Sequence, residues 1–179
     1  MHPHPVLVEA LRGGAVESAH RGALAIVDGD GALVASLGDV ARPVFPRSAV
    51  KLLQALPLVA SGAAERWALS DAELALACAS HGGEPAHVAT AAGLLARLGL
   101  DAAVLECGSH WPSHEGSARA LARAGGDPLA LHNNCSGKHS GFVCLGCLLA
   151  GDRERPGFLA GYVQAEHPVM REEIGRAHV

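Results

Sequence analysis

The sequence predicts an α+β fold in which an antiparallel sheet is flanked by helices. Short apolar runs in residues 6–40 are separated by glycine-rich turns, which is typical of strands joined by hairpins. From residue 49 onward, apolar residues recur at helical spacing between capping residues and glycines. A chain of 179 residues with strands first and helices afterwards fits one domain with an α+β layer fold.

The predicted strands lie in the first 40 residues and form an antiparallel meander. They cover residues 6–11, 23–27 and 32–37. The pair Gly13-Gly14 and the segment 28–31, with sequence DGDG, supply the turn residues between them.

Helices are predicted over most of the remaining chain. They cover residues 49–59, 71–79, 85–98, 116–124 and 142–150, and one further strand covers residues 103–107. Ser70 and Asp71 form an N-terminal cap, and Gly99 ends the third helix. Ser48 follows two prolines and therefore lies at or next to the start of the first helix. The polar residues 132–141 predict a loop.

The composition excludes several functional classes. Hydrophobic residues make up 49% and charged residues 18%, which is typical of a globular protein and not of a disordered one. The net charge of −4, without a basic stripe and with 3% aromatic residues, argues against a nucleic-acid partner. Apolar runs shorter than the roughly 20 residues of a membrane span, and no secretion signal, predict a soluble protein without a membrane partner. Five cysteines in no disulfide-scaffold spacing favour a reducing compartment, the cytoplasm.

The first candidate for chemistry is the S-x-x-K spacing of Ser48 and Lys51. Residues three apart share a helix face, so the amine can reach the hydroxyl and take its proton. A lysine amine is normally protonated at neutral pH, so this role requires surroundings that favour the neutral form. The alternative is an ordinary N-cap serine with a solvated lysine.

Two further segments carry chemically active residues. In residues 78–87 a predicted helix ends in Ser80 and His81, which display polar groups at a corner or simply cap the helix. Residues 132–141 contain Cys, Lys and two His between apolar segments, a pattern that a solvated turn does not explain. In this segment Cys135, with His132 or His139, could hold zinc if another ligand came from elsewhere.

Other cysteines and polar residues allow two interpretations. Cys144 and Cys147 form a CxxC inside an apolar helix and are interpreted as core residues rather than a metal pair. Residues 107–114 follow the predicted strand and either line the same cleft or form a turn.

Together, these motifs resemble the rhizobial-type L-asparaginase family, also called the asparaginase II family. The motifs are FPRSAVK at 45–51, ACASHGGE at 77–84 and HNNCSGKH at 132–139, with further matches at 16–22, 56–62 and 167–169. The resemblance covers nearly the whole chain to about Glu172. It implies hydrolysis of L-asparagine to aspartate and ammonia, on a fold similar to that of serine β-lactamases and serine-dependent glutaminases.

The resemblance also implies roles for individual residues. Ser48 with Lys51 is one serine–lysine pair, Ser80 supplies the serine of a second, and Cys135 and Lys138 bind a zinc ion near the substrate. In the expected reaction Ser48 attacks the side-chain amide, Lys51 carries the proton, and water releases the acyl-enzyme. Candidates for holding the α-carboxylate and α-amine of L-asparagine are Arg47, Asn133 and His139.

The resemblance further implies a homodimer for the full-length protein, and it suggests that this chain is truncated. The second lysine and the third zinc ligand lie beyond position 179 in the family. Residues 1–173 are therefore expected to be the N-terminal portion of a single asparaginase domain, and residues 174–179 a non-native read-through tail. A missing C-terminal half would leave an unpaired sheet edge and exposed apolar surface.

Other functions remain open at this point. A serine–lysine acyl hydrolase of the β-lactamase or penicillin-binding type would be expected to carry a secretion signal. A glutaminase differs by one methylene of substrate, which the sequence does not resolve. A non-catalytic zinc module could use Cys135, Cys144, Cys147 and His139, but it leaves Ser48, Lys51 and Ser80 unexplained.

Overall fold

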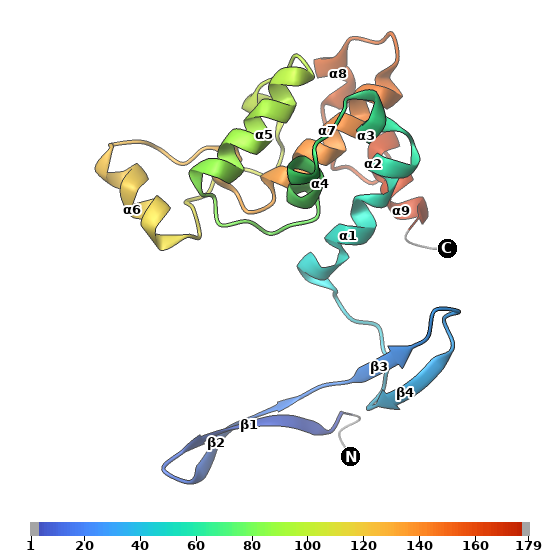
Figure 1. Cartoon of the computed structure of the whole chain (residues 1–179), viewed down its shortest axis with the longest axis vertical. Helices are drawn as coiled ribbons and strands as arrows, with labels where there is room; N and C mark the ends of the chain where they lie inside the picture. The colour runs from blue at the N-terminus through green and yellow to red at the C-terminus, as the bar shows by residue number, and fades with distance from the viewer. Residues whose placement is uncertain (1–3, 177–179) are drawn as a thin grey trace. The chain divides into compact units, whose positions relative to one another are not determined.

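The computed structural model describes residues 4–176 and divides into two compact units at Phe45 and Pro46. Residues 4–45 form the sheet unit, and residues 46–176 form the helical unit (Figure 1). Small antiparallel sheets followed by helices confirm the α+β class.

The sheet unit consists of two hairpins. Its strands are β1 (Val6–Arg12), β2 (Ala15–Arg21), β3 (Leu24–Val27) and β4 (Leu33–Leu37). β1 pairs with β2 across a turn in which Gly13 and Gly14 both have positive φ, and β3 pairs with β4. The carboxylate of Asp28 closes the second turn by accepting hydrogen bonds from the N–H groups of Asp30 and Ala32.

The predicted meander is only partly right. The turns and three strands are where the sequence placed them, but the hairpins form separate two-stranded sheets. β2 was not predicted, because its sequence AVESAHR places polar residues between the small and apolar ones and contains no apolar run. Every strand residue is exposed, so among the described residues the sheet unit has unpaired edges and uncovered apolar side chains.

The helical unit is built around one central helix, α7 (Ser136–Ala150), which contacts six other helices. These helices are α2 (Leu56–Ala60), α3 (Ala63–Arg66), α4 (Asp71–Ala77), α5 (Pro85–Arg97), α8 (Arg155–Leu159) and α9 (Pro168–Arg176). The remaining elements are η1 (Arg47–Val50), α1 (Lys51–Gln54), η2 (Ala102–Val104), α6 (Glu115–Arg123) and η3 (Ala130–His132). The middle of α7, including Val143 and Leu145, is fully buried in the core.

Several helix boundaries follow the predicted signals. At the start of α4, Ser70 and Glu73 exchange the two hydrogen bonds of a capping box. Gly99 follows α5 with φ of +74°, and the N–H of Leu100 bonds back to the carbonyl of Leu95. Both ends therefore satisfy backbone groups that would otherwise be unpaired.

Three predictions of local structure are wrong. The predicted helix 49–59 is divided at Ala55, because Pro57 lacks an N–H and its ring conflicts with a continuous helix. Residues 103–107 do not form a strand, since the Asp101 carboxylate binds the N–H of Ala103 and starts the 3-10 turn η2. The predicted loop 132–141 ends early, because α7 already begins at Ser136.

The start of α7 lies very close to α4. A Cβ on Gly137 would lie 2.3 Å from the carbonyl oxygen of Leu76, and a Cβ on Gly141 would lie 3.3 Å from the Cβ of Ala77. Small residues therefore allow the two helices to approach at backbone distance. This close approach brings the polar segments next to the two helices together.

One face of α1 and α2 is apolar and exposed. Leu52, Leu53, Leu56 and Val59 expose between 49% and 64% of their surface, so the rest of the helical unit does not cover them. At the C-terminus, residues 174–176 of the predicted non-native tail continue α9, and residues 177–179 lie outside the described residues.

Candidate active site

Lys51 is the centre of the candidate site. Its side chain is buried, with 2% of the residue exposed, and its amine contacts three oxygen atoms. Nζ donates to the carbonyl of Ala79 at 2.8 Å, to Oγ of Ser80 at 2.8 Å and to the carbonyl of Asn134 at 3.3 Å. Three acceptors match the three N–H groups of a protonated amine.

Ser80 is an exposed residue whose Oγ contacts the buried amine of Lys51. The residue is exposed and lies just after α4, in the turn that leads toward α5. If Lys51 lost one proton, its two remaining N–H groups could stay on the carbonyls of Ala79 and Asn134. The lone pair of the amine would then face the Ser80 hydroxyl and could accept its proton.

Two segments far apart in sequence form the floor around Lys51. Residues 79–83 and 131–136 are joined where the N–H of His81 donates to the carbonyl of Asn134. Nε2 of His81 lies 2.9 Å from Oγ of Ser136. Gly83 has φ of +73°, and a Cβ there would lie 2.7 Å from the carbonyl of His132, so a larger residue would separate the segments.

Ser48 lies outside this hydrogen-bonded cluster. It is exposed in the 3-10 turn η1 that leads into α1, which agrees with its expected place before the helix. Among the described residues, the recorded hydrogen bonds of the Lys51 amine go to Ala79, Ser80 and Asn134 and not to Ser48. The Ser48–Lys51 pair therefore stays a prediction.

Arg47 has the backbone strain that often accompanies functional positions. Its φ is +52°, a backbone conformation that residues other than glycine adopt at a cost of about 1–3 kcal/mol. Its side chain is exposed next to Ser48. Binding of the substrate carboxylate by Arg47 remains a prediction.

The other predicted substrate-binding residues hold the protein together. Asn133 donates to the carbonyls of Cys107 and Gly108 and accepts from the N–H of Cys135, so its amide is fully engaged. His139 is buried in α7, where Nδ1 lies 2.6 Å from the hydroxyl of Tyr162. Burial, with smaller contributions from two nearby lysines, lowers the pKa of His139 to about 4, so the ring is neutral at physiological pH.

Cys135 and Lys138 lie one helical turn apart, and both are half-buried. The Lys138 amine lies 5.3 Å from the centre of the Phe142 ring. Burial raises the pKa of the Cys107 thiol, Cys135 raises it further, and the charge of Lys138 opposes the rise. A thiolate and a neutral amine can each donate an electron pair to zinc, so the two residues fit part of a zinc site. Within residues 4–176, however, no three His, Cys, Asp or Glu side chains gather as a metal would need.

Cys144 and Cys147 are core residues, as predicted. Both are buried in α7. Burial and the neighbouring thiol raise the pKa of Cys144 to about 12, and burial also raises the pKa of Cys147. A thiolate is the form that binds metal, so this environment does not support the alternative of a zinc module.

Sequence reasoning left His81 as either a polar group displayed at a corner or a helix cap, and it did not single out Tyr162 or Glu173. His81 stood inside a recognised motif, but its link to Ser136 depends on a contact across 55 positions. Tyr162 is the one tyrosine of the chain, and its sequence neighbours give no sign that it lies beside His139. Glu173 is a buried acid within an otherwise ordinary helical pattern.

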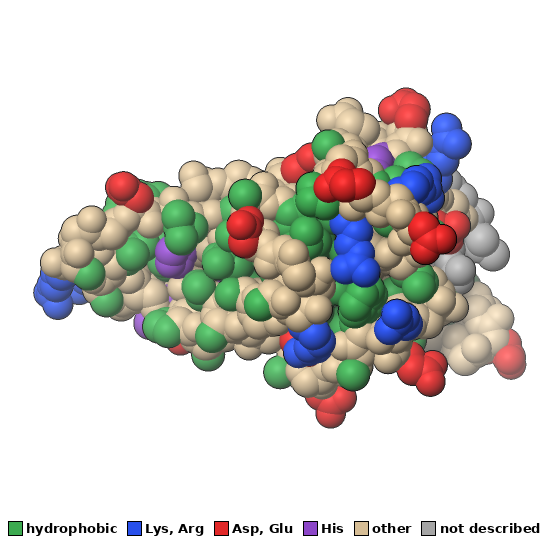
Figure 2. All heavy atoms as spheres, turned by 90° about the horizontal axis from the view of Figure 1, so that it is seen from above, with side chains coloured by type: hydrophobic (Ala, Val, Ile, Leu, Met, Phe, Trp, Pro, Cys, Tyr) green, Lys and Arg blue, Asp and Glu red, His purple; other side chains and the backbone are tan. Residues whose placement is uncertain are grey.

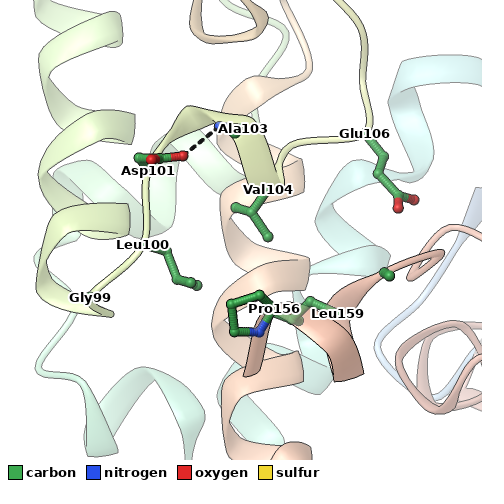
Figure 3. Close-up of a pocket in the computed structure, with 9 residues that line it drawn as sticks. Gly99, Leu100, Asp101, Ala103, Val104, Glu106, Pro156 and Leu159 are labelled. Atoms are coloured by element: carbon green, nitrogen blue, oxygen red, sulfur yellow. Dashed lines mark hydrogen bonds between the residues drawn. The ribbon is translucent and has the colours of Figure 1, made fainter. Parts of the chain in front are cut away.

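Two pockets of the helical unit are lined by residues other than Lys51 and Ser80. The larger, of about 640 Å³, has an apolar floor of Leu100, Val104, Pro156 and Leu159 (Figure 3). Its Asp101 is hydrogen-bonded to the N–H of Ala103. The second, of about 470 Å³, is mostly apolar but is lined by Gly83 and His132 from the two site segments.

Charged side chains of both signs lie on the face of the molecule seen in Figure 2. On the face seen in Figure 2, the described Lys and Arg side chains alternate with Asp and Glu and form no continuous basic band. In the described part of the chain, every helix is too short or too polar to traverse a bilayer.

Comparison with known proteins identifies the family. The family model for L-asparaginase II matches residues 8–177, nearly the whole chain, and includes all three site segments. No curated protein matches the chain. The chain therefore belongs to the L-asparaginase II family.

Proposed function

We propose that the protein is an amidohydrolase that converts L-asparagine to L-aspartate and ammonia by a serine–lysine acyl-enzyme mechanism. The observation that carries this proposal is the contact between the buried Lys51 amine and the exposed Ser80 hydroxyl, in a chain of the L-asparaginase II family. A buried amine beside an exposed hydroxyl is the arrangement that a lysine general base requires.

In the proposed reaction Ser48 attacks the side-chain amide carbon of asparagine. Lys51, in its neutral form, takes the Ser48 proton and gives it to the departing nitrogen, which leaves as ammonia. Water then attacks the aspartyl ester, its proton passes to Lys51, and Ser48 recovers its hydroxyl. Backbone N–H groups at η1, including that of Ser48, are the proposed donors to the oxyanion.

A second candidate for the nucleophile is Ser80. A neutral Lys51 that keeps its bonds to the carbonyls of Ala79 and Asn134 would direct its lone pair at Ser80. In that case Ser80 either attacks the substrate itself or passes a proton between Ser48 and Lys51.

The activity is tested by measuring ammonia release from asparagine and from glutamine. The chain is assayed alone and joined to the C-terminal half of a family member, since the family resemblance places a second lysine there. Lys51→Met and Ser80→Ala are expected to lower kcat by about 100-fold or more, since removal of a general base typically costs about 10²–10⁴-fold. A folded joined protein that releases no ammonia from either amide would refute the proposed function, and a preference for glutamine would make it a glutaminase.

The nucleophile is identified by quenching the reaction and locating the aspartyl group by mass spectrometry. An adduct on the peptide that contains Ser48 supports Ser48 as the nucleophile. An adduct on the peptide that contains Ser80 assigns the attack to Ser80 instead. Ser48→Ala and Ser80→Ala provide the matched negative samples.

Cys135 and Lys138 are proposed as ligands of a zinc ion, which would polarise a nearby carbonyl group or hold the segment 132–139 in place. The expected result is one equivalent of zinc in the joined protein, which supplies the third ligand that the resemblance implies, and loss of that zinc in its Cys135→Ser variant. Cys147→Ser is the control, because Cys147 is buried away from solvent. Equal zinc content in both variants would remove zinc from the proposal.

A further inference from the structure

His81 is the residue next to Ser80, and its side chain points into the protein. Only 5% of the residue is exposed. Its ring contacts a neighbouring segment instead of solvent, which is unusual for a residue that merely ends a helix.

The hydrogen bonds of His81 fix which ring nitrogen carries the proton. The N–H of Gly83 donates to Nδ1 at 3.1 Å, so Nδ1 must be the unprotonated nitrogen. Nε2 then carries the hydrogen and donates to Oγ of Ser136 at 2.9 Å. The Ser136 hydroxyl in turn donates to the carbonyl of Leu131 at 3.0 Å. Each of the three hydrogens in this series of hydrogen bonds therefore has an acceptor.

This series of hydrogen bonds ends in the segment 131–136, which also contains an acceptor of the Lys51 amine. Ser136 follows two residues after Asn134, whose carbonyl accepts from both the Lys51 amine and the N–H of His81. The His81 ring therefore connects the turn that carries Ser80 to the start of α7. The separation of these two segments determines whether the Ser80 hydroxyl reaches Lys51.

We infer that His81 is a positioning residue of the proposed reaction, whose neutral, Nε2-protonated ring holds Ser80 in contact with Lys51 by donating to Ser136. This inference rests on the proposed function. It adds to the serine–lysine chemistry a residue that does not touch the reacting atoms.

The surroundings of His81 favour the neutral ring. The charged or titratable groups that act on it are Lys51 on α1, His87 on α5 and His110 before α6, all of them basic, while Ser136 on α7 is neutral. The His87 ring lies 5.1 Å from the His81 ring, centre to centre. Burial, reinforced by these neighbours, lowers the pKa of His81 to about 4.

Two substitutions at position 81 separate the two hydrogen bonds. Glutamine places an N–H near the position of Nε2 and can still donate to Ser136, whereas asparagine places an oxygen near Nδ1 and keeps only the bond from Gly83. His81→Asn is expected to lower kcat by about 100-fold with KM within about threefold, because a misplaced catalytic group costs about that much. His81→Gln is expected to keep kcat within about tenfold of the parent, and Ser136→Ala to behave like His81→Asn. His20→Gln, at an exposed ring on β2, is the control and leaves kcat unchanged.

The outcomes distinguish this inference from the proposed function. Equal kcat values for His81→Asn and the parent would overturn the positioning role, and so would a higher kcat for His81→Asn than for His81→Gln. In either case the losses in Lys51→Met and Ser80→Ala would still stand. Full activity in Lys51→Met would instead refute the proposed mechanism.

A measurement on the unmutated chain keeps the inference testable if a variant fails to fold. In protein labelled with ¹⁵N-histidine, the NMR signals of His81 are expected to show a protonated Nε2 and an unprotonated Nδ1 at pH 7. They should also show a neutral ring at pH 5, where an ordinary histidine is mostly charged. A ring protonated on Nδ1, or charged at pH 7, would contradict the assignment.

Discussion

Glu173 is expected to make the stability of the protein fall as the pH rises. It lies on α9 with 6% of the residue exposed, and neither carboxylate oxygen has a hydrogen-bond partner among the described residues. Burial raises the pKa of Glu173 from 4.5 to about 8; the charge of Lys138 opposes this rise, and Glu172 adds slightly to it. The folded protein therefore keeps a proton on Glu173 at neutral pH, whereas the unfolded chain has lost it.

The magnitude follows from the two pKa values. The contribution of Glu173 to stability is largest below pH 4.5, where its carboxyl is protonated in both states, and it is lost progressively between pH 4.5 and pH 8. At pH 7 the pH lies about 2.5 pH units above the pKa of the unfolded state. Since each unit corresponds to about 1.4 kcal/mol, Glu173 lowers the free energy of unfolding at pH 7 by about 3 kcal/mol relative to its value below pH 4.5.

Glu173→Gln removes the titration while keeping the shape of the side chain. Urea unfolding at pH 5 and pH 8 is expected to show that the parent loses about 3 kcal/mol more than the variant over this interval. Other groups titrate in both proteins, so their effects cancel in the difference. Glu166→Gln, at an exposed position, is the control and should follow the parent. Parallel pH dependence of parent and Glu173→Gln would show that Glu173 is ionised in the folded protein and would refute the reasoning.

Three further predictions concern packing and protonation. Gly137→Ala is expected to lower the free energy of unfolding by about 1–3 kcal/mol, because its Cβ would meet the Leu76 carbonyl, and unchanged urea unfolding would contradict this close contact. Trp67→Phe should change stability by at most about 1 kcal/mol, since it removes a buried indole N–H without a partner within residues 4–176 but weakens the ring contacts with Arg66 and Arg155; a larger change in thermal unfolding would contradict this balance. Acid should destabilise the protein between pH 6.5 and pH 4, because burial lowers the pKa values of His81 and His139 to about 4 and the unfolded chain binds protons first. The loss is up to about 3 kcal/mol for each ring. In Glu173→Gln, where the opposing titration of Glu173 is absent, a constant urea midpoint over this interval would contradict it.

Local signals in the sequence predicted much of the secondary structure. The turn at Gly13 and Gly14, the cap at Ser70 and the end of α5 at Gly99 each depend on residues next to one another. The start of α7 could not be predicted in this way. Residues such as Gly137 favour loops in isolation and are helical here because contact with α4 requires small residues.

The candidate site could be predicted by segment but not by contact. In the structure the Lys51 amine contacts Ala79, Ser80 and Asn134, so it touches both of the other two motif segments. Spacing within a helix suggested Ser48 as the partner of Lys51, whereas the recorded bond goes to Ser80. A bond across 29 positions depends on how α1 and α4 pack, which no local pattern contains.

The acceptors around the Lys51 amine limit how mutation can change it. Two of the three are main-chain carbonyls, those of Ala79 and Asn134, which no side-chain replacement at those positions deletes. Point mutation can reach the amine directly only through Ser80. An engineer who wishes to change the two main-chain contacts of this lysine must therefore redesign the course of a loop, and random single substitutions at positions 79 and 134 should return variants that keep these contacts.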